Sequence, residues 1–278
     1  MSALDRTGQV AIITGASRGI GRAIALRLAA AGMDIAIGAK TEVSSEARPG
    51  TIHDAAREVE ALGRRALAVP TDVRDEAQIE RLVARTVETF GRVDVVVNNA
   101  GAIRWEPVET LPVRLLDRMI AINHRAPLLL ARAAIPHLRA SGHGHIVNLC
   151  PPLERDAAAL GGWSGRTAYL MTKYAMSHLT LGLAAELAPD RVAVDGLWPR
   201  TLIDTQATRV FAAWFATAGP WRSPRVVADA CHALVTTPWA PAATGRLLLD
   251  EEVLAAAGIR DLSGYAVSPP ASSRAPGS

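Results

Sequence analysis

The sequence has few of the residues that build disulfide-rich, metal-binding or membrane-embedded proteins. Only two of its 278 residues are cysteines, Cys150 and Cys231, and their spacing fits no metal-binding motif. Such usage favours a reducing compartment and argues against a disulfide scaffold, so we expect a cytoplasmic protein without a bound metal. No run of about 18 residues is both apolar and free of charge, and the N-terminus shows no secretion signal, so we expect no membrane span.

Lysine is also scarce. Of the 30 basic residues, two are lysines, Lys40 and Lys173, and the other 28 are arginines. Lysine is a compact charge with a movable pKa, so we expect these two to stand where an arginine would not serve. The net charge of +3 and the pI near 9.2 would suit nucleic acid. The arginines are scattered among acids along helix-like segments, however, so we expect a solvated surface and no nucleic-acid partner.

Short apolar runs alternate with helical patterns along most of the chain. This alternation predicts βαβ units and a parallel sheet buried on both faces. We expect a three-layer α/β sandwich with a doubly wound sheet of about seven strands, in a single domain over residues 1–267. The tail, residues 268–278, is rich in proline, serine and glycine and is expected to be disordered. We predict strands at 9–14, 33–38, 66–69, 93–97, 145–149, 192–197 and 246–249, and helices at 19–31, 51–62, 75–90, 115–139, 168–187 and 223–235.

A glycine-rich turn joins the first strand to the first helix. It reads Thr14-Gly15-Ala-Ser-Arg-Gly19-Ile-Gly21, with the spacing G-x-x-x-G-x-G instead of the commoner G-x-G-x-x-G. Glycines let a backbone approach a pyrophosphate closely, and a helix N-terminus offers unpaired N–H groups. Its place between a strand and a helix predicts a dinucleotide site in a Rossmann-type fold.

The end of the second strand indicates which dinucleotide is bound. A site for NAD usually ends this strand in an acid that binds the ribose 2′-hydroxyl. Here the strand ends in Gly38-Ala39-Lys40, and Arg18 lies within the glycine turn. Two cations near the adenosine ribose suit a 2′-phosphate and favour NADP, whereas the nearby Glu42 leaves NAD open.

Tyr169 and Lys173 lie four residues apart on a predicted helix and therefore share one face. A nearby ammonium favours the phenolate and would lower the tyrosine pKa from about 10 toward the working pH. Such a tyrosine can give a proton to a carbonyl oxygen or take one from an alcohol.

Together these motifs resemble the short-chain dehydrogenase/reductase family. The matching pieces are TGASRGIG (14–21), Asp72-Val73, NNAG (98–101), Asn123 and YLMTK (169–173), in the family's order over roughly residues 8–250. Further stretches are similar to the hydroxysteroid-dehydrogenase-like branch: AKT (39–41), PGTIHDAA (49–56), NLCPPL (148–153), LWPRT (197–201) and LLLDEEVL (247–254). Larger members of that branch carry a C-terminal sterol-carrier domain, which we do not expect within these 278 residues.

The resemblance implies a role for each matched residue. Tyr169 would be the general acid/base, Lys173 would bind the nicotinamide ribose and tune Tyr169, and Asn123 would hold a water in a proton relay. The helices at 115–139 and 168–187 would pair subunits into a homodimer or homotetramer. Cofactor contacts are expected from Gly15, Ser17, Arg18, Gly19, Ile20, Gly21, Lys40, Asp72, Val73, Asn99, Ala100, Gly101, Tyr169, Lys173, Pro199, Thr201 and Ile203, with Asn98 behind the adenine.

Cys150 stands where the family usually places a serine that hydrogen-bonds the substrate oxygen. Two prolines follow it, and we expect them to aim its side chain into the cleft. A thiol is a weaker donor than a hydroxyl. Three alternatives follow: the thiol replaces the serine at lower efficiency, Ser164 or Thr167 reaches in, or the protein binds nucleotide without turnover. An ordinary buried thiol is also open.

The resemblance makes residues 201–224 a mobile lid, and aromatic residues make it apolar. Those rings, Phe211, Trp214, Phe215 and Trp221 together with Trp163, suit a hydrophobic substrate, although they could equally pack a core or a subunit interface. Two functions therefore stand. The first is an NADP-dependent oxidoreductase acting on a hydrophobic secondary alcohol or ketone. The second is a catalytically weak nucleotide-binding sensor or assembly protein.

Overall fold

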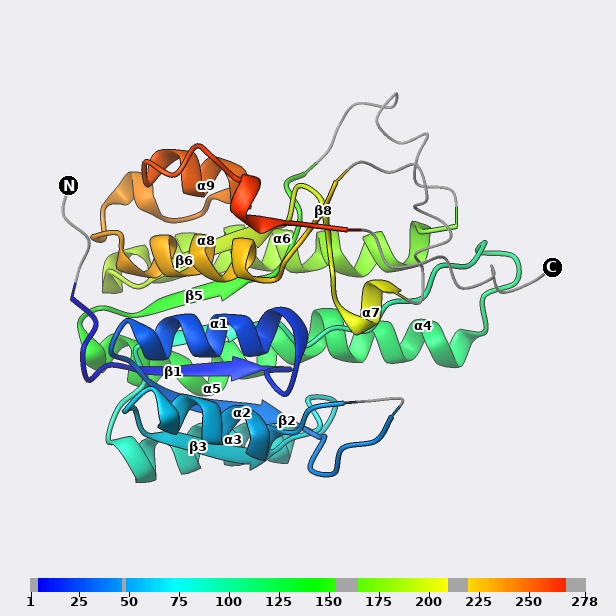
Figure 1. Cartoon of the computed structure of the whole chain (residues 1–278). Helices are drawn as coiled ribbons and strands as arrows, with labels where there is room; N and C mark the ends of the chain where they lie inside the picture. The colour runs from blue at the N-terminus through cyan, green and yellow to red at the C-terminus, as the bar shows by residue number, and fades with distance from the viewer. Residues whose placement is uncertain (1–4, 47–48, 154–164, 210–219, 269–278) are drawn as a thin grey trace.

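A seven-stranded parallel sheet forms the centre of the protein (Figure 1). The computed structural model describes residues 5–46, 49–153, 165–209 and 220–268. The strand order is β3-β2-β1-β4-β5-β6-β9, which reverses direction between β1 and β4. This arrangement confirms the predicted Rossmann-type sandwich and places a ligand crevice at the carboxyl ends of β1 and β4. The strands are β1 Val10–Thr14, β2 Asp34–Ala39, β3 Ala66–Pro70, β4 Val95–Asn98, β5 His145–Asn148, β6 Ala193–Trp198 and β9 Leu247–Leu249.

Helices cover both faces of the sheet. Alternate side chains of β1 divide between two apolar cores: Ala11 and Ile13 pack with α1, α2 and α8, whereas Val10 and Ile12 pack with α3, α5 and α6. The first layer contains α1 (Gly19–Ala30), α2 (Ile52–Ala61) and α8 (Arg225–Thr236), and the second contains α3 (Glu76–Phe90), α5 (Ala126–Ser141) and α6 (Thr167–Leu187). No described helix has the length and apolar character that crossing a membrane requires.

Local sequence signals set the helix ends. Thr51 accepts a hydrogen bond from the backbone N–H of Asp54, whose carboxylate accepts one from the N–H of Thr51, so α2 begins with a capping box. Asp75 begins α3 by accepting hydrogen bonds from the N–H groups of Ala77 and Gln78, and Gly91 ends that helix with a left-handed backbone. These caps direct the chain back toward the sheet after each strand.

The predicted helix 115–139 is interrupted. It consists of α4 (Val113–Ile120), a π-helical turn (Ala121–Arg125) and α5. Pro127 lies two residues after the end of the turn and has no N–H to donate to the carbonyl of Asn123 four residues earlier. The helical segment is therefore irregular just before Pro127, and the irregularity involves Asn123.

A second sheet, which the sequence patterns did not predict, packs beside the cleft. Its three short strands, in the order β10-β8-β7, are β7 (Leu202–Ile203), β8 (Trp221–Arg222) and β10 (Ala266–Val267). Trp221 is 2% exposed and packs against Trp105 from the β4–α4 loop as well as the flanking strands. Trp221 therefore packs in a small core, which is one of the two alternatives open for these aromatic residues. Phe211, Trp214, Phe215 and Trp163 lie outside the described residues. The remaining elements are α7 (Gln206–Arg209), α9 (Asp250–Ala256) and 3-10 turns at Ala188–Asp190, Pro241–Ala243 and Ser263–Tyr265.

Candidate active site

A cleft of about 2080 Å³ follows the carboxyl ends of the strands. It is larger than the roughly 300–1,000 Å³ typical of small-molecule pockets, so it has room for a dinucleotide and a substrate. We call the part around the glycine turn, Lys40 and Asp72 the cofactor half, and the part around Tyr169 and Trp105 the substrate half. The predicted residues that line the cleft are Gly15, Ser17, Arg18, Gly19, Ile20, Lys40, Asp72, Val73, Asn99, Ala100, Gly101, Tyr169, Lys173, Pro199, Thr201 and Ile203.

The glycine turn is closely packed against the loop after β4. Gly15 has a φ of +68°, and a Cβ added there would lie 2.9 Å from Ala100 Cα. Gly21 does not line the cleft but lies behind the turn, where an added Cβ would lie 2.4 Å from Asn99 Nδ2. That amide donates to the carbonyl of Thr14 at 2.8 Å. Asn99 thus locks the turn, and because the first turn of α1 contains no acid, its N–H groups can receive a pyrophosphate.

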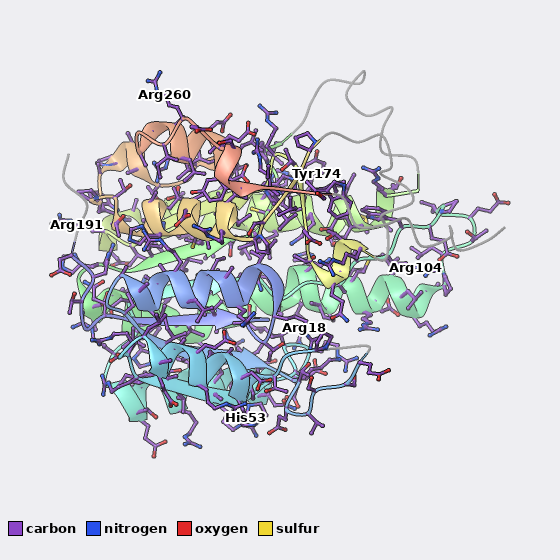
Figure 2. The ribbon with its side chains drawn as sticks, in the orientation of Figure 1. Arg18, His53, Arg104, Tyr174, Arg191 and Arg260 are labelled. Atoms are coloured by element: carbon purple, nitrogen blue, oxygen red, sulfur yellow. The ribbon has the colours of Figure 1, made fainter. Side chains whose placement is uncertain are left out.

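Two cations lie where the adenosine ribose would bind. Lys40 follows β2 directly and is exposed on the cleft wall. Arg18 lies at the beginning of α1 (Figure 2), and its Nη2 donates to the carbonyl of Gly50 at 3.0 Å. Glu42, the residue that left NAD open, is not among the described lining residues; its carboxylate lies 3.7 Å from His53 Nε2.

Asp72 and Val73 lie at the edge expected for the adenine. Hydrogen bonds from Arg74 are the main reason that the pKa of Asp72 falls to about 2, and the charge of Lys40 acts in the same direction. Asp72 is therefore a carboxylate at any physiological pH. Asn98 lies behind this edge, where its amide donates to Asn148 Oδ1 at 2.8 Å.

Tyr169 and Lys173 both line the cleft from α6, yet both are largely buried. Tyr169 packs with Met119 and Trp105, and burial raises its pKa above the usual value. Burial also lowers the pKa of Lys173 to about 8. The expectation that the ammonium lowers the tyrosine pKa is therefore wrong for this state of the protein, because desolvation of the phenol dominates.

Lys173 is held by the backbone between β5 and Cys150. Its Nζ donates to the carbonyl of Leu149 at 2.6 Å and lies 5.6 Å from the ring centroid of Trp198. This contact fixes the ammonium between β5 and β6, one helical turn from Tyr169.

Asn123 lies behind the cleft wall. Its Oδ1 accepts from the N–H of Ala102 at 2.8 Å, and its Nδ2 donates to the carbonyl of Ala102 and to Thr172 Oγ1. The side chain thereby joins the loop after β4 to the helix that bears Tyr169. Because the side-chain amide is already engaged, a relay water would have to be held by the backbone carbonyl of Asn123. Pro127 has no N–H to donate to that carbonyl.

Cys150 does not face the cleft, so the expectation that the prolines aim it there is wrong. The residue is fully buried, and its Sγ lies 3.5 Å from Thr180 Oγ1. The thiol fills the space beside Gly196 on β6, where an added Cβ would lie 2.7 Å from Sγ. Pro151 and Pro152 line the cleft instead. Of the alternative hydroxyls, Thr167 is exposed and not among the lining residues, and Ser164 lies outside the described residues.

Thr201 supplies a polar atom suited to a bound group. Its Oγ1 is buried and has no hydrogen-bond partner among the described residues. It lies between Pro199 and Ile203 on the cleft wall, where the nicotinamide is expected. A buried hydroxyl without a partner is costly unless a ligand satisfies it, so the residues present fit an amide-bearing ring.

The described residues contain no group of three or more His, Cys, Asp or Glu side chains that could hold a metal. His145 Nε2 lies 3.0 Å from Asp195 Oδ2, far from the glycine turn along the strands. This is the polar packing expected for a buried histidine.

Several residues of the substrate half escaped prediction. Trp105 comes from the loop after β4, Arg118 from α4, and Arg166 and Tyr174 from α6. The spacing of Arg166 and Tyr169 is a usable signal, because residues three apart share a helix face. Trp105 lies on a loop whose course the sequence does not indicate, whereas Arg118 and Tyr174 lie on helices that the sequence predicted without marking these two positions.

The geometry supports hydride exchange followed or preceded by proton exchange. A phenol, an ammonium and a hydroxyl without a hydrogen-bond partner among the described residues line one end of the cleft, and the glycine turn lines the other. Such a site can orient a ring, exclude water from it and move a proton at the phenolic oxygen.

Comparison with known proteins agrees with this geometry. The sequence profile of the short chain dehydrogenases matches residues 9–214. Hydroxysteroid dehydrogenase-like protein 2 of Xenopus tropicalis is 42% identical over 270 residues, which cover 96% of this chain and 63% of that protein. The chain thus spans less than two thirds of the length of this relative.

Solved structures show the same similarity. A putative dehydrogenase from Xanthomonas campestris superposes with a TM-score of 0.85 at 44% identity, covering 96% of this chain and 95% of that one. A metagenomic short-chain oxidoreductase in complex with NADP gives 0.69 at 28% identity, and a short chain dehydrogenase from Mycobacterium paratuberculosis bound to NAD gives 0.74 at 25%; each covers 88% of this chain and 97% of the other. The chain belongs to the short chain dehydrogenase family of oxidoreductases.

Proposed function

We propose that the protein is an NADP-dependent oxidoreductase that exchanges hydride between the nicotinamide and a hydrophobic secondary alcohol or ketone. One observation carries this proposal: the buried pair Tyr169 and Lys173 opens onto the same cleft as the glycine turn and Lys40. The cofactor would be held by the turn, by Arg18 and Lys40 at its 2′-phosphate, and by Thr201 at its carboxamide. When bound, it supplies or receives the hydride.

Tyr169 is the proposed general acid/base. Because burial raises its pKa, the hydroxyl keeps its proton at neutral pH and can donate it to a carbonyl oxygen. In the opposite direction a phenolate must form, and the charge of Lys173 one turn away favours it. Burial lowers the pKa of Lys173 to about 8, so it gives up its proton more readily than an exposed lysine does.

The proposed proton path continues behind Lys173. The amide of Asn123 is engaged with Ala102 and Thr172, which leaves the backbone carbonyl of Asn123 as the group that would hold a relay water. The π-helical turn and Pro127 support this assignment, because together they interrupt the regular backbone hydrogen bonds at that point.

The proposed preference for NADP depends on Lys40. Replacing it in Lys40→Ala should weaken NADPH binding by roughly 10- to 150-fold and leave NADH binding within about twofold, since a charge-assisted contact is worth roughly 1.5–3 kcal/mol. Isothermal titration with both nucleotides measures this. Glu42→Gln, which changes a nearby charge outside the lining, is the control. Equal losses for NADPH and NADH would contradict the preference.

The oxidoreductase proposal is tested by NADPH oxidation with a panel of apolar ketones. Tyr169→Phe should lower kcat by about 10²–10⁴ because it removes the proton donor, while the Kd for NADPH stays within about twofold. A variant as active as the wild type would refute the assigned role of Tyr169.

A nucleotide-binding sensor or assembly protein is the second candidate. It is favoured by one finding: Cys150 faces away from the cleft, and proline carbons line the wall where the family resemblance implies a hydroxyl. Tight NADPH binding with no turnover of any ketone or alcohol would support it.

The proposed assembly is a homodimer or homotetramer in the cytoplasm. Leu128 on α5 and Met171 on α6 are 44% and 50% exposed, and they belong to the two helices expected to pair subunits. Light scattering of the wild type and of Met171→Asp would show whether these helices associate.

A further inference from the structure

The cleft wall expected to face the nicotinamide begins where strand pairing stops. β6 pairs with β9 as far as Trp198 opposite Leu249, and directly after that pair β9 gives way to α9. Pro199 has no N–H, and the N–H of Arg200 lies beyond the last pair of the ladder. These two residues lead directly into Thr201, so the course of the backbone here decides where the Thr201 hydroxyl lies.

A side chain continues the contact where the strand pairing ends. Asp250, the first residue of α9, is fully buried, and its Oδ1 accepts a hydrogen bond from the N–H of Arg200 at 2.9 Å. The same oxygen accepts one from the N–H of Glu251 at 2.9 Å, so the helix itself orients the carboxyl group. The segment between β6 and β7 is thereby tied to α9 at the residue before Thr201.

The charge of Asp250 does not favour the folded state. Its Oδ2 is buried without a hydrogen-bond partner among the described residues, which costs free energy of folding. Burial is also the main reason that the pKa of Asp250 is raised, although the hydrogen bonds from the N–H groups of Arg200 and Glu251 oppose this shift. The carboxyl group therefore serves as an acceptor at Oδ1, and an amide oxygen can take the same place.

Thr201 is the residue of this wall that Asp250 can influence. Its Oγ1 is buried, and no described residue hydrogen-bonds to it. Thr201 lines the cleft, whereas Asp250 is not among the described lining residues. An effect of Asp250 on a bound cofactor must therefore pass through the backbone of Arg200.

We propose that Asp250 is a positioning residue for the nicotinamide: by holding the N–H of Arg200, it places the Thr201 hydroxyl where the carboxamide of the ring can meet it. Without this contact the segment can shift, and a misplacement of about 1 Å is enough to weaken such an interaction. The adenosine part of the cofactor would meet the glycine turn and Lys40, which Asp250 does not hold. This inference rests on the proposed oxidoreductase function, from which it takes the place of the ring.

The test compares two ligands that share the adenosine part. NADPH carries the nicotinamide ring, whereas adenosine 2′,5′-bisphosphate carries the same adenine and 2′-phosphate without the ring. In Asp250→Ala the Kd for NADPH should rise about tenfold in isothermal titration, while the Kd for the bisphosphate should change less than about twofold. Asp250→Asn keeps an acceptor at the Oδ1 position and should bind both ligands as the wild type does.

A double-mutant cycle tests whether Asp250 acts through Thr201. Thr201→Val removes the hydroxyl and keeps the shape of the side chain, so it should weaken NADPH binding and spare the bisphosphate. Adding Asp250→Ala to Thr201→Val should then raise the Kd for NADPH by less than about twofold, because the group that Asp250 positions is gone. Losses that multiply in the double variant would overturn the route through Thr201.

Glu252→Ala is the matched control for Asp250→Ala. Glu252 is also a carboxylate in the first turn of α9, and it also accepts from a backbone N–H, that of Leu249 at 3.0 Å. Its removal should lower stability through loss of a cap and leave the binding of both ligands unchanged. If Asp250→Ala does not fold, Asp250→Ser takes its place, because serine is tolerated at the beginning of a helix and its shorter side chain withdraws the acceptor.

The outcomes for this inference and for the proposed function are distinct. If Asp250→Ala weakens both ligands equally, or neither, the positioning role is overturned, and ketone reduction by the wild type still supports the oxidoreductase. If Asp250→Ala weakens NADPH alone while the wild type turns over no ketone or alcohol, the positioning role stands and the oxidoreductase is refuted. A wild type that binds NADPH no more tightly than the bisphosphate would also overturn the inference, because the ring then gains nothing from this wall.

Discussion

The two halves of the cleft are constructed differently. The cofactor half is mostly consecutive backbone: β1, the glycine turn and the first turn of α1, held by the side chains of Asn99 and Thr14. The substrate half is assembled from side chains of separate segments: Trp105 after β4, Arg118 on α4, Tyr169 on α6 and Trp198 at the end of β6. The shape of the cofactor half depends on the course of the backbone, and the shape of the substrate half depends on how side chains pack.

This difference explains which half can vary. A backbone cradle tolerates almost no added atom, whereas a wall of side chains can change its shape and charge one residue at a time. The following predictions test how far the two halves behave differently.

The largest effect is expected in the cofactor half, from Gly21→Ala. The added Cβ would lie 2.4 Å from Asn99 Nδ2 and 2.7 Å from the carbonyl of Gly15, so the turn must shift. Overpacking costs about 1–3 kcal/mol, and a loss of binding free energy of that size raises the Kd for NADPH by roughly 5- to 150-fold. Fluorescence titration with NADPH measures the change.

Gly182→Ala is the matched control for that variant. Gly182 is also helical, in α6, but an added Cβ would meet nothing within 4 Å. The variant should gain about 0.5–1 kcal/mol of stability from helix propensity and bind NADPH as the wild type does. If Gly21→Ala also binds NADPH normally, the glycine turn can shift without loss of binding, and the cofactor half tolerates added atoms as the substrate half does.

The strand, turn and helix of the cofactor half could be predicted from the sequence for the same reason. Gly15, Gly19 and Gly21 signal a close backbone approach, and strand two ends visibly in Lys40 without an acid. The short second sheet could not be predicted, because its strands have two residues each and come from segments far apart. Periodicity needs longer runs than that.

The site's chemistry was harder to predict than its location. The spacing of Tyr169 and Lys173 placed both on one helix face correctly, but a pKa depends on everything packed around a group. Met119 and Trp105 come from other segments and dominate through burial. The direction of Cys150 likewise depends on the space left by Gly196 on a neighbouring strand.

An intermediate effect is expected where the two halves meet, at Lys173. Its pKa of about 8 lies below the ordinary 10.5, so between these values the unfolded chain binds more protons and stability rises with pH. Lys173→Met removes this dependence. The free energy of unfolding of the variant minus that of the wild type should therefore fall by about 2 kcal/mol between pH 7 and pH 9.5.

Urea unfolding at equal protein concentrations measures this difference. Lys40→Met removes the chain's other lysine, which is exposed, and controls for loss of a positive charge. A difference between Lys173→Met and the wild type that stays constant from pH 7 to 9.5 would mean that Lys173 is not desolvated in solution.

The smallest effect is expected behind the substrate half, at Cys150. Thr180 Oγ1 lies 3.5 Å from its Sγ, so a serine hydroxyl would find a polar neighbour, and the side chain does not reach the cleft. Cys150→Ser should change kcat/KM for any reduced ketone by less than about twofold and stability by less than about 0.5 kcal/mol, as is usual where no buried group loses its partner.

Cys231→Ser provides the contrast. Cys231 is fully buried in the apolar core of α8, and burial raises its pKa to about 12. A hydroxyl placed there should cost about 1 kcal/mol or more, which thermal unfolding of both variants would resolve. A large gain in kcat/KM for Cys150→Ser would mean instead that the side chain at position 150 reaches the substrate in the working enzyme and takes part in the reaction.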